Sequence, residues 1–145
     1  MRESPEQLDW ERQCPLAITS DVIWKLDAYR ASLFLQHLSL GDLGALKSVR
    51  PQATITEQLA TAVGSISANL AEGYSRSTRA DRLRFLGYSL GSTRESIVWY
   101  QGARGTLADE IVNDRLALLT RIRSLLLGLI RSTRGDIPLR PRLES

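Results

Sequence analysis

The stretch SISANLAEGYSRSTRADRLRFLGYSLGS, residues 65–92, decides the fold because it contains the end of one predicted helix and the beginning of the next. Around its first half, apolar residues recur every three or four positions, which is the spacing of one buried helix face. The helix that they predict begins near Thr54 or Thr56, either of which can cap it, and ends near Tyr74. Its buried stripe consists of Leu59, Val63, Ile66 and Leu70.

The second half of the stretch starts another helix after the short loop SRST, residues 75–78. Thr78 and, three residues later, Asp81 make an approximate capping box, with aspartate in place of the usual glutamate. Because the loop is short, the two helices are expected to be neighbours and antiparallel. The segment GARGT at 102–106 interrupts the second helix, whose apolar stripe is Leu83, Leu86, Leu90 and Ile97.

Two further helices are predicted on either side of this pair. The first runs from about Ser20, which acts as its cap, to about Leu43, and Gly41 and Gly44 mark its frayed end. The last runs over about 107–134, with apolar residues again at helical spacing. Pro51, in the connection KSVRPQAT, disfavours helix at the residue before it, so the chain is expected to turn there.

These elements predict a single all-α domain, since 145 residues can bury one core and no segment alternates apolar and polar residues as a half-buried strand does. We expect an antiparallel up-down-up-down four-helix bundle over residues 20–134. Residues 1–19 are expected to form a largely irregular N-terminal extension. Residues 135–145 contain two prolines and no periodicity, which predicts a disordered C-terminal tail.

Cysteine usage and hydropathy favour a cytoplasmic protein. Cys14 is the one cysteine, so the chain forms no internal disulfide, and the sequence offers no paired ligands for zinc. The acidic, polar start of the chain does not resemble a signal peptide. The longest apolar run, SLLLGLI at 124–130, is too short to span a bilayer, so we expect no membrane association.

The charges are unevenly distributed along the chain, although the net charge is only +3. Residues 1–75 carry six basic and nine acidic side chains, whereas residues 76–145 carry thirteen basic and seven acidic ones. Lys25 and Lys47 are the only lysines among nineteen basic residues. Arginine suits bidentate contact with phosphate and stacking on bases, but a preference for arginine also arises from genome composition.

Small residues predict close packing between the second and third helices. Gly87 and Gly91 lie one turn apart on the third helix, while Ser67, Ala68 and Ala71 lie on the second. Small side chains on facing surfaces allow two helix backbones to approach closely. The spacing also matches a membrane dimerisation motif, but that interpretation fails because the chain has no apolar span.

Polar residues interrupt the apolar faces of both helices. At about 100° per residue, Asn69 falls on the flank of the buried face and Glu72 lies further round. The same count places Arg94 near the middle of the apolar face of the third helix, where an unpaired charge is costly. Glu72, or an acidic residue of a neighbouring subunit, is a candidate partner. The alternative is that Arg94 extends to solvent at the rim of a short bundle.

A cluster of arginines surrounds the turn between these helices, diluted only by Glu72 and Asp81. The following helix N-terminus adds partial positive charge and open N–H groups, so the turn is suited to hold a phosphate. Charge clusters are also commonly just solvated surface. The candidate nucleic-acid-binding residues are Arg76, Arg79, Arg82 and Arg84 at the turn, extended by Arg123, Arg131 and Arg134 on the outward side of the fourth helix.

Catalysis is difficult to build from these residues. His37 is the single histidine and Cys14 lies beside Pro15, so neither a histidine-based triad nor a thiol pair is plausible. Three carboxylates, Glu72, Asp81 and Glu95, have no companion histidine, phosphate-binding glycine loop or H-E-x-x-H pattern. We therefore expect a protein that is not an enzyme and needs no cofactor or metal.

The segment NLAEGYSRSTRADRLRFLGYSLGSTRES resembles the pattern of small four-helix proteins encoded within intervening sequences of bacterial 23S ribosomal RNA genes. That family also includes the accessory variability determinant protein of diversity-generating retroelements. The pattern is an Asn-x-Ala-Glu-Gly run, a polar loop, an aromatic and leucine-bearing helix, and Gly-Ser followed three residues later by Glu. The matching positions, which are the structural motif, are Asn69, Ala71, Glu72, Gly73, Phe85, Leu86, Gly91, Ser92 and Glu95, to which we add Arg94.

The resemblance implies an antiparallel four-helix bundle that assembles into a barrel-shaped homopentamer and has no enzymatic role. For the retroelement member, it implies both a basic surface that binds nucleic acid and association with a reverse transcriptase. Our first hypothesis is an oligomeric scaffold that binds RNA or DNA through its arginines. The second is an adaptor that binds a protein, such as a reverse transcriptase, with no direct nucleic-acid role, and the third is a carboxylate-based enzyme.

Overall fold

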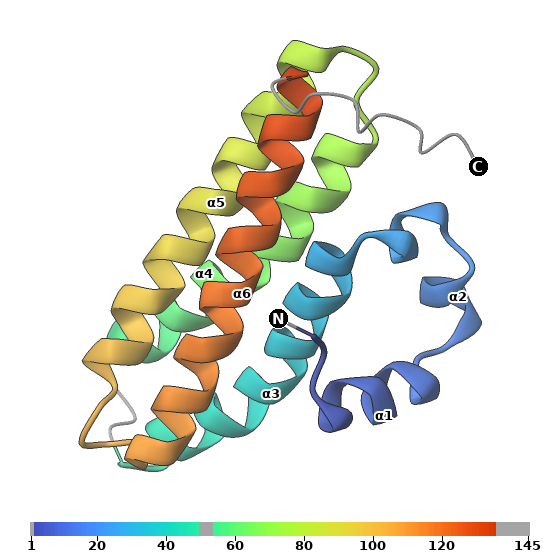
Figure 1. Ribbon diagram of the computed structural model, residues 1–145. Helices are drawn as coiled ribbons and strands as arrows, with labels where there is room; N and C mark the ends of the chain where they lie inside the picture. The colour runs from blue at the N-terminus through green and yellow to red at the C-terminus, as the bar shows by residue number, and fades with distance from the viewer. Residues whose placement is uncertain (1, 50–53, 136–145) are drawn as a thin grey trace.

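The computed structural model describes residues 2–49 and 54–135, and the regular elements in these ranges are helices (Figure 1). The structure has four long helices within these ranges. Each packs against the next one along the chain, and the last also packs against the first. The prediction of an all-α fold with antiparallel packed helices is confirmed. These helices are α3 (Asp27–Val49), α4 (Thr54–Tyr74), α5 (Arg79–Gly102) and α6 (Asp109–Arg134).

The core is aliphatic and is built from one face of each long helix. Leu35 of α3, Ile66 of α4, Leu119 of α6 and Leu126 of α6 are fully enclosed, and Leu86 and Leu90 are the leucines that α5 buries. Burying each such side chain contributes about 1.5–3 kcal/mol to folding. No helix within the described ranges combines the length and the hydropathy needed to cross a bilayer.

The turn between α4 and α5 forms where the capping residues predicted it. α4 ends at Tyr74, and α5 begins at Arg79 after the N-cap Thr78. The Thr78 hydroxyl accepts a hydrogen bond from the Asp81 backbone N–H at 3.2 Å, which satisfies one of the open donors of the first turn. α6 ends at Arg134, and its C-cap residue Gly135 adopts the left-handed conformation with φ 80°. The remainder of the predicted tail, 136–145, lies outside the described residues, as does the turn at 50–53.

The first long helix starts and ends later than the sequence indicated. Ser20 is not its cap; the Asp21 carboxylate instead accepts from the Ile23 N–H at 3.1 Å and caps a short 3-10 helix, η1 (Val22–Lys25). Leu26 is extended, and α3 then begins. The helix also continues through Gly41 and Gly44, whose cost of about 1 kcal/mol each is offset by packing on its opposite face.

The expectation that residues 1–19 are largely irregular is wrong. Two helices lie there, α1 (Pro5–Gln13) and α2 (Leu16–Thr19). Ser4 caps α1 by accepting a hydrogen bond from the Gln7 N–H at 3.1 Å, and Pro5 occupies the first helical position, where its missing N–H costs nothing. This signal was present in the sequence, but the segment has no apolar stripe to accompany it.

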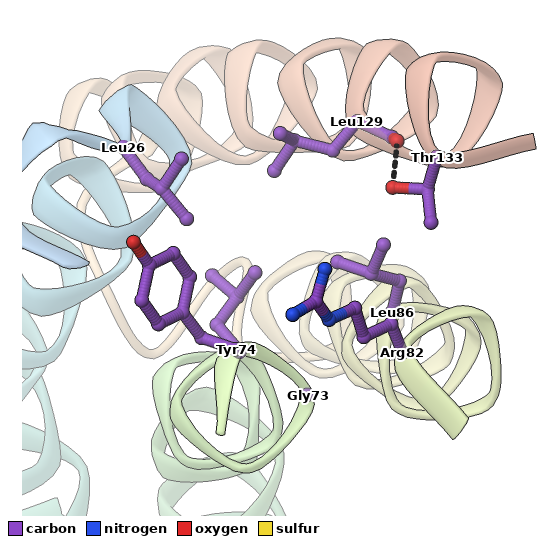
Figure 2. A pocket seen from close by; sticks show the side chains of 8 residues that line it. Leu26, Gly73, Tyr74, Arg82, Leu86, Leu129 and Thr133 are labelled. Atoms are coloured by element: carbon purple, nitrogen blue, oxygen red, sulfur yellow. Dashed lines mark hydrogen bonds between the residues drawn. The ribbon is translucent and has the colours of Figure 1, made fainter. Parts of the chain in front are cut away.

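A pocket opens at the end of the bundle that contains the α4–α5 turn (Figure 2). It lies between the start of α3, the end of α4, the start of α5 and the end of α6, and it has a volume of about 310 Å³. The residues that line it are Leu26, Leu70, Gly73, Tyr74, Arg82, Leu86, Leu129 and Thr133.

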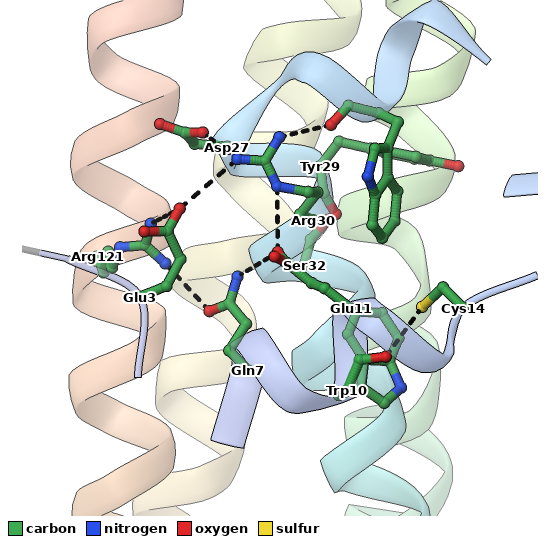
Figure 3. Close-up of polar contacts among 11 residues, drawn as sticks. Glu3, Gln7, Trp10, Glu11, Cys14, Asp27, Tyr29, Arg30, Ser32 and Arg121 are labelled. Atoms are coloured by element: carbon green, nitrogen blue, oxygen red, sulfur yellow. Dashed lines mark hydrogen bonds and ion pairs between the residues drawn. The ribbon is translucent and has the colours of Figure 1, made fainter. Parts of the chain in front are cut away.

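The N-terminal segment is held against the bundle by charged and polar contacts (Figure 3). Arg30 of α3 donates to the Glu11 carboxylate at 3.1 Å and lies 3.6 Å from the Glu3 carboxylate. Arg121 of α6 lies 3.3 Å from Glu3 and donates to the Gln7 side chain at 3.2 Å. Two arginines of the bundle therefore bind the first residues of the chain, and we call Glu3, Gln7, Glu11, Arg30 and Arg121 the N-terminal clamp.

Aromatic residues support the clamp from the other side of α1. The Trp10 ring centroid lies 5.6 Å from that of Phe34, 5.7 Å from that of His37 and 6.4 Å from that of Trp24. His37 is exposed and stacks on Trp10. The N-terminal segment is therefore part of the folded unit, joined to α3 and α6 by both apolar and charged contacts.

The close approach of α4 to α5 occurs at other residues than those predicted. Gly87 and Gly91 are exposed, and a Cβ added at either would meet nothing within 4 Å. The close contact lies at Gly73, where an added Cβ would be 3.0 Å from the Cβ of Phe85. Further along, the Ser89 hydroxyl donates to the Ile66 carbonyl oxygen across the interface at 2.8 Å.

The buried face of α5 explains this difference and a second one. It is built largely from small polar residues, Ser89, Thr93 and Ser96, which an apolar pattern does not count. The centre of the buried face therefore lies to one side of the stripe of leucines and Ile97 that the sequence predicted for this helix. As a result Arg94 is exposed and does not lie in the middle of the apolar face, and Glu72 pairs with Arg76 at 3.1 Å.

Candidate nucleic-acid interface

Four arginines lie around the α4–α5 turn, as the sequence indicated. Arg79, Arg82 and Arg84 are exposed, and Arg76 is partly exposed. Two carboxylates dilute the cluster: Glu72 lies 3.1 Å from Arg76 and Asp81 lies 3.2 Å from Arg84. With four positive and two negative side chains, the turn keeps a net charge of +2.

The ring of Phe85 organises two of these arginines. The guanidinium carbon of Arg76 lies 4.8 Å from the ring centroid and that of Arg84 lies 5.1 Å from it. Such cation–π contacts contribute about 0.5–1 kcal/mol each at exposed sites. Phe85 also packs close to Gly73 at the helix interface, so the ring links both arginines to the contact between α4 and α5.

Arg82 is fixed in a different way. Its Nε donates to the Arg76 backbone carbonyl oxygen at 2.8 Å, which satisfies one of the carbonyls in the turn. The carboxylates of the turn are engaged with other arginines, so Arg82 keeps its terminal nitrogens without an acidic partner among the described residues. Arg79 is exposed at the first position of α5. These two arginines are the ones that the turn offers to an external anion.

The end of α6 brings two more arginines to the same end of the bundle. Thr133 of α6 lines the pocket together with Arg82, which places the last turn of α6 beside the start of α5 (Figure 2). Arg131 and Arg134 flank Thr133 and are exposed, and in the last turn they also favour the negative end of their own helix. Arg123 is half-buried and precedes Arg131 by about 12 Å of helix.

The remaining residues of the predicted motif have local structural contacts. The Asn69 amide, half-buried, donates to the Ser65 carbonyl oxygen of its own helix at 2.9 Å. The half-buried Ser92 accepts, through its carbonyl, the Ser96 hydroxyl at 2.8 Å. The exposed Glu95 accepts the Trp99 indole N–H at 3.3 Å. Gly73 has the clearest packing role of the set, since it allows the close approach to Phe85.

Metal-binding side chains do not gather at this surface or elsewhere in the part of the chain that the structure describes. Within the described ranges, no group of three or more histidine, cysteine, aspartate and glutamate side chains is placed to hold a metal. Burial raises the pKa of the Cys14 thiol, and the charge of Glu11 raises it further, so this thiol is a poor nucleophile at neutral pH.

A buried polar cluster near the opposite end of the bundle was not predicted from the sequence. Asp42 of α3 is 4 % exposed and accepts the Tyr100 hydroxyl of α5 at 2.7 Å. Arg115 of α6 donates to both Asp42 carboxylate oxygens, at 2.8 and 3.1 Å. One buried acid thus joins three helices. The residues are far apart in the sequence, and none of them belongs to a motif.

The pattern of the 23S rRNA-intervening sequence protein family matches residues 45–128, from the end of α3 through most of α6. The N-terminal clamp residues Glu3, Gln7, Glu11 and Arg30 lie outside this match. A crystal structure of a protein of unknown function, from the S23 ribosomal protein family of Bacteroides thetaiotaomicron, has a similar fold, with a TM-score of 0.68 and 22% identity. The similarity covers 72% of this chain and 98% of that one.

No functionally curated protein is similar enough to this chain to count as a match. The family match nevertheless extends over more than half of the 145 residues. The fold is also that of a solved protein of the S23 ribosomal protein family. The chain therefore belongs to the 23S rRNA-intervening sequence protein family.

Proposed function

We propose that the protein is a non-enzymatic, cytoplasmic, oligomeric scaffold that binds RNA through the arginine surface at one end of the bundle. The observation that carries this proposal is the pair Arg79 and Arg82, which are exposed and have no carboxylate partner among the described residues. Arg131 and Arg134 extend the surface from α6. Arginine side chains and open helix N–H groups both bind phosphate well.

RNA is favoured over a protein partner because the exposed side chains of the turn keep a net positive charge. Backbone phosphates bind such a surface without reading a sequence, so affinity is expected to be modest and weakly specific. DNA would offer the same phosphates and is expected to compete.

We also propose that the protein assembles through the outer face of α5, as the resemblance to pentameric proteins implies. On this face Tyr88 is 51% exposed and Val98 is 63% exposed. Gly87 precedes Tyr88 and Gly91 lies between Tyr88 and Val98, both with open space above the backbone, which allows another helix to approach closely. A second copy of the chain is the occupant that we assign to this face.

Fluorescence anisotropy with a labelled hairpin RNA tests the RNA-binding proposal. The logarithm of the affinity should fall linearly with the logarithm of the salt concentration, with a slope of about −0.7 to −0.9 for each phosphate contacted. The double variant Arg79→Gln/Arg82→Gln should bind more weakly, and its slope should be smaller in magnitude by about 1.5.

A matched double variant, Arg12→Gln/Lys47→Gln, removes two exposed positive charges away from the arginine surface. It should leave the slope unchanged. Absence of RNA binding at low salt, or an equal loss in both double variants, would contradict a specific arginine surface. If RNA binding is absent while a defined protein is still recovered with the assembly, the adaptor hypothesis replaces this one.

Sedimentation velocity tests the assembly. A pentamer would have a mass of about 81 kDa, five times the chain mass of 16.2 kDa. Gly91→Arg should dissociate it, whereas Leu40→Arg, an exposed position on α3, should not. A wild-type protein that sediments as a monomer at micromolar concentration would rule out the assembly.

A further inference from the structure

We propose that the pocket between α3, α4, α5 and α6 is a binding site for a small amphipathic carboxylate, with the carboxylate on Arg82 and the hydrocarbon chain on the leucines (Figure 2). This small-molecule site shares Arg82 with the proposed RNA-binding surface, but its apolar wall lies apart from Arg79, Arg131 and Arg134. A medium-chain fatty acid is the ligand class that the pocket fits.

The wall of the pocket is aliphatic. It is formed by Leu26, just before α3, Leu70 of α4, Leu86 of α5 and Leu129 of α6, so four separate segments converge on one cavity. Leu70 and Leu86 also belong to the core, whereas Leu26 and Leu129 remain half-buried at the pocket. A hydrocarbon chain in this space would remove apolar surface from water on both partners, which is favourable.

The polar groups of the pocket lie on two sides: Arg82 and Thr133 on one, and the Tyr74 hydroxyl beside Leu26 on the other (Figure 2). The guanidinium of Arg82 projects over the pocket between Tyr74 and Thr133, and the hydrogen bond from its Nε to the Arg76 carbonyl oxygen, 2.8 Å, holds it there (Figure 2). The Thr133 hydroxyl is already used, since it donates to the Leu129 carbonyl oxygen at 2.8 Å. One cation with free terminal N–H groups beside an apolar wall suits a single carboxylate.

The size and chemistry of the pocket select this ligand class over others. The volume of about 310 Å³ lies at the lower end of the range for small-molecule sites. A nucleotide would find one aromatic ring, that of Tyr74, and mostly aliphatic surface in place of stacking partners. A polyvalent anion would find one arginine in the lining and leave the leucines exposed. An aliphatic monocarboxylate uses both halves of the pocket.

Isothermal titration of the full chain with hexanoate, heptanoate and octanoate tests the proposal. Each added methylene should tighten binding about fourfold, because burying one is worth about 0.8 kcal/mol. Octanamide has nearly the same shape without the charge, and it should bind at least tenfold more weakly than octanoate. Failure of octanoate to bind at about 10 mM, or equal binding of octanamide, would overturn the proposal.

Two variants locate the site. Arg82→Gln should weaken octanoate binding at least tenfold, whereas Arg79→Gln, an equal loss of charge on the same helix outside the pocket, should not. Thr133→Met fills the apolar space and should abolish binding while circular dichroism shows an unchanged helix content. Binding that survives Thr133→Met, or that responds equally to both arginine variants, would mean that octanoate does not occupy this pocket. RNA anisotropy is scored separately, so failure of one proposal does not decide the other.

Discussion

Arg115 and Asp42 form a two-pronged ion pair, in which one guanidinium donates to both carboxylate oxygens, at 2.8 and 3.1 Å. The side chain of Asp42 is 5% exposed and that of Arg115 is 13% exposed, so the pair is largely withdrawn from water. A buried pair of this kind contributes little net stability compared with apolar residues, but removal of one partner leaves a buried charge. The pair therefore fixes the alignment of α3 with α6, because another alignment would leave the Asp42 charge buried without Arg115.

Replacement of Arg115 should show this asymmetry. Arg115→Met is expected to lower the free energy of unfolding by about 3 kcal/mol, since Asp42 stays buried without its cation. Tyr100→Phe removes one neutral hydrogen-bond donor and should cost only about 1 kcal/mol. Urea denaturation of the two variants measures both values. Equal costs would mean that the Asp42 charge is solvated once Arg115 is lost.

Alkaline pH should unfold the protein partly through Tyr100. Burial raises the pKa of its hydroxyl well above the ordinary value of 10.0, and the hydrogen bond to Asp42 raises it further. A raised folded-state pKa gives stability that is complete below the unfolded-state pKa and is lost as pH rises above it. The wild type should therefore lose stability above about pH 10 more steeply than Tyr100→Phe does. Urea midpoints across alkaline pH measure the difference, and parallel curves would contradict it.

Gly73 and Gly41 should respond oppositely to alanine. A Cβ at Gly73 would lie 3.0 Å from the Cβ of Phe85, so Gly73→Ala should force α4 and α5 apart and cost about 1 kcal/mol or more. Gly41 is exposed in the interior of α3 with nothing within 4 Å, so Gly41→Ala should stabilise by up to about 1 kcal/mol. Thermal unfolding compares them. A stabilised Gly73→Ala variant would show that the helix contact is loose.

Acid should release the N-terminal segment before the bundle unfolds. A backbone hydrogen bond lowers the pKa of Glu3 below its ordinary value of 4.5, and the charges of Arg121 and Arg30 act in the same direction against the effect of burial. A depressed pKa gives stability that is present above the unfolded-state value and is lost as pH falls through the folded-state value. Proteolysis within residues 2–13 should therefore increase below pH 4.5.

The variant Glu3→Gln supplies the control for acid release. It should already be more susceptible to proteolysis at neutral pH, and its susceptibility should depend less on pH than that of the wild type. If both proteins are cleaved with the same pH profile, Glu3 does not control the release.

Sequence patterns predicted α4 and α5 well because both the apolar spacing and the capping residues lie within the helices themselves. Thr78 and Asp81 form their cap locally, and no distant contact is needed to place it. The predicted rotation of α5 about its axis, which placed Arg94 in the buried face, was wrong. Ser89 and Thr93 occupy that face because they make contacts with α4 and within α5 that hydropathy does not encode. Local chemistry thus gave the helix limits but not the helix orientation.

The candidate site was predictable only in part. The arginines of the turn are visible in the sequence, but their pairing is not. The ion pair between Arg76 and Glu72, and the lack of an acidic partner for Arg82 among the described residues, depend on side-chain geometry around the turn. The N-terminal clamp could not be anticipated, because Gln7 and Arg121 are 114 positions apart.

That separation orders events during synthesis. The contacts of α1 with α3, through Trp10, Phe34 and Arg30, are available as soon as the first third of the chain has left the ribosome. The contacts of Glu3 and Gln7 with Arg121 must wait until the first half of α6 has emerged, several seconds later at about 5–20 residues per second. The first residues of the chain therefore reach their final contacts only after α6 has begun to emerge, although their contacts with α3 are available much earlier.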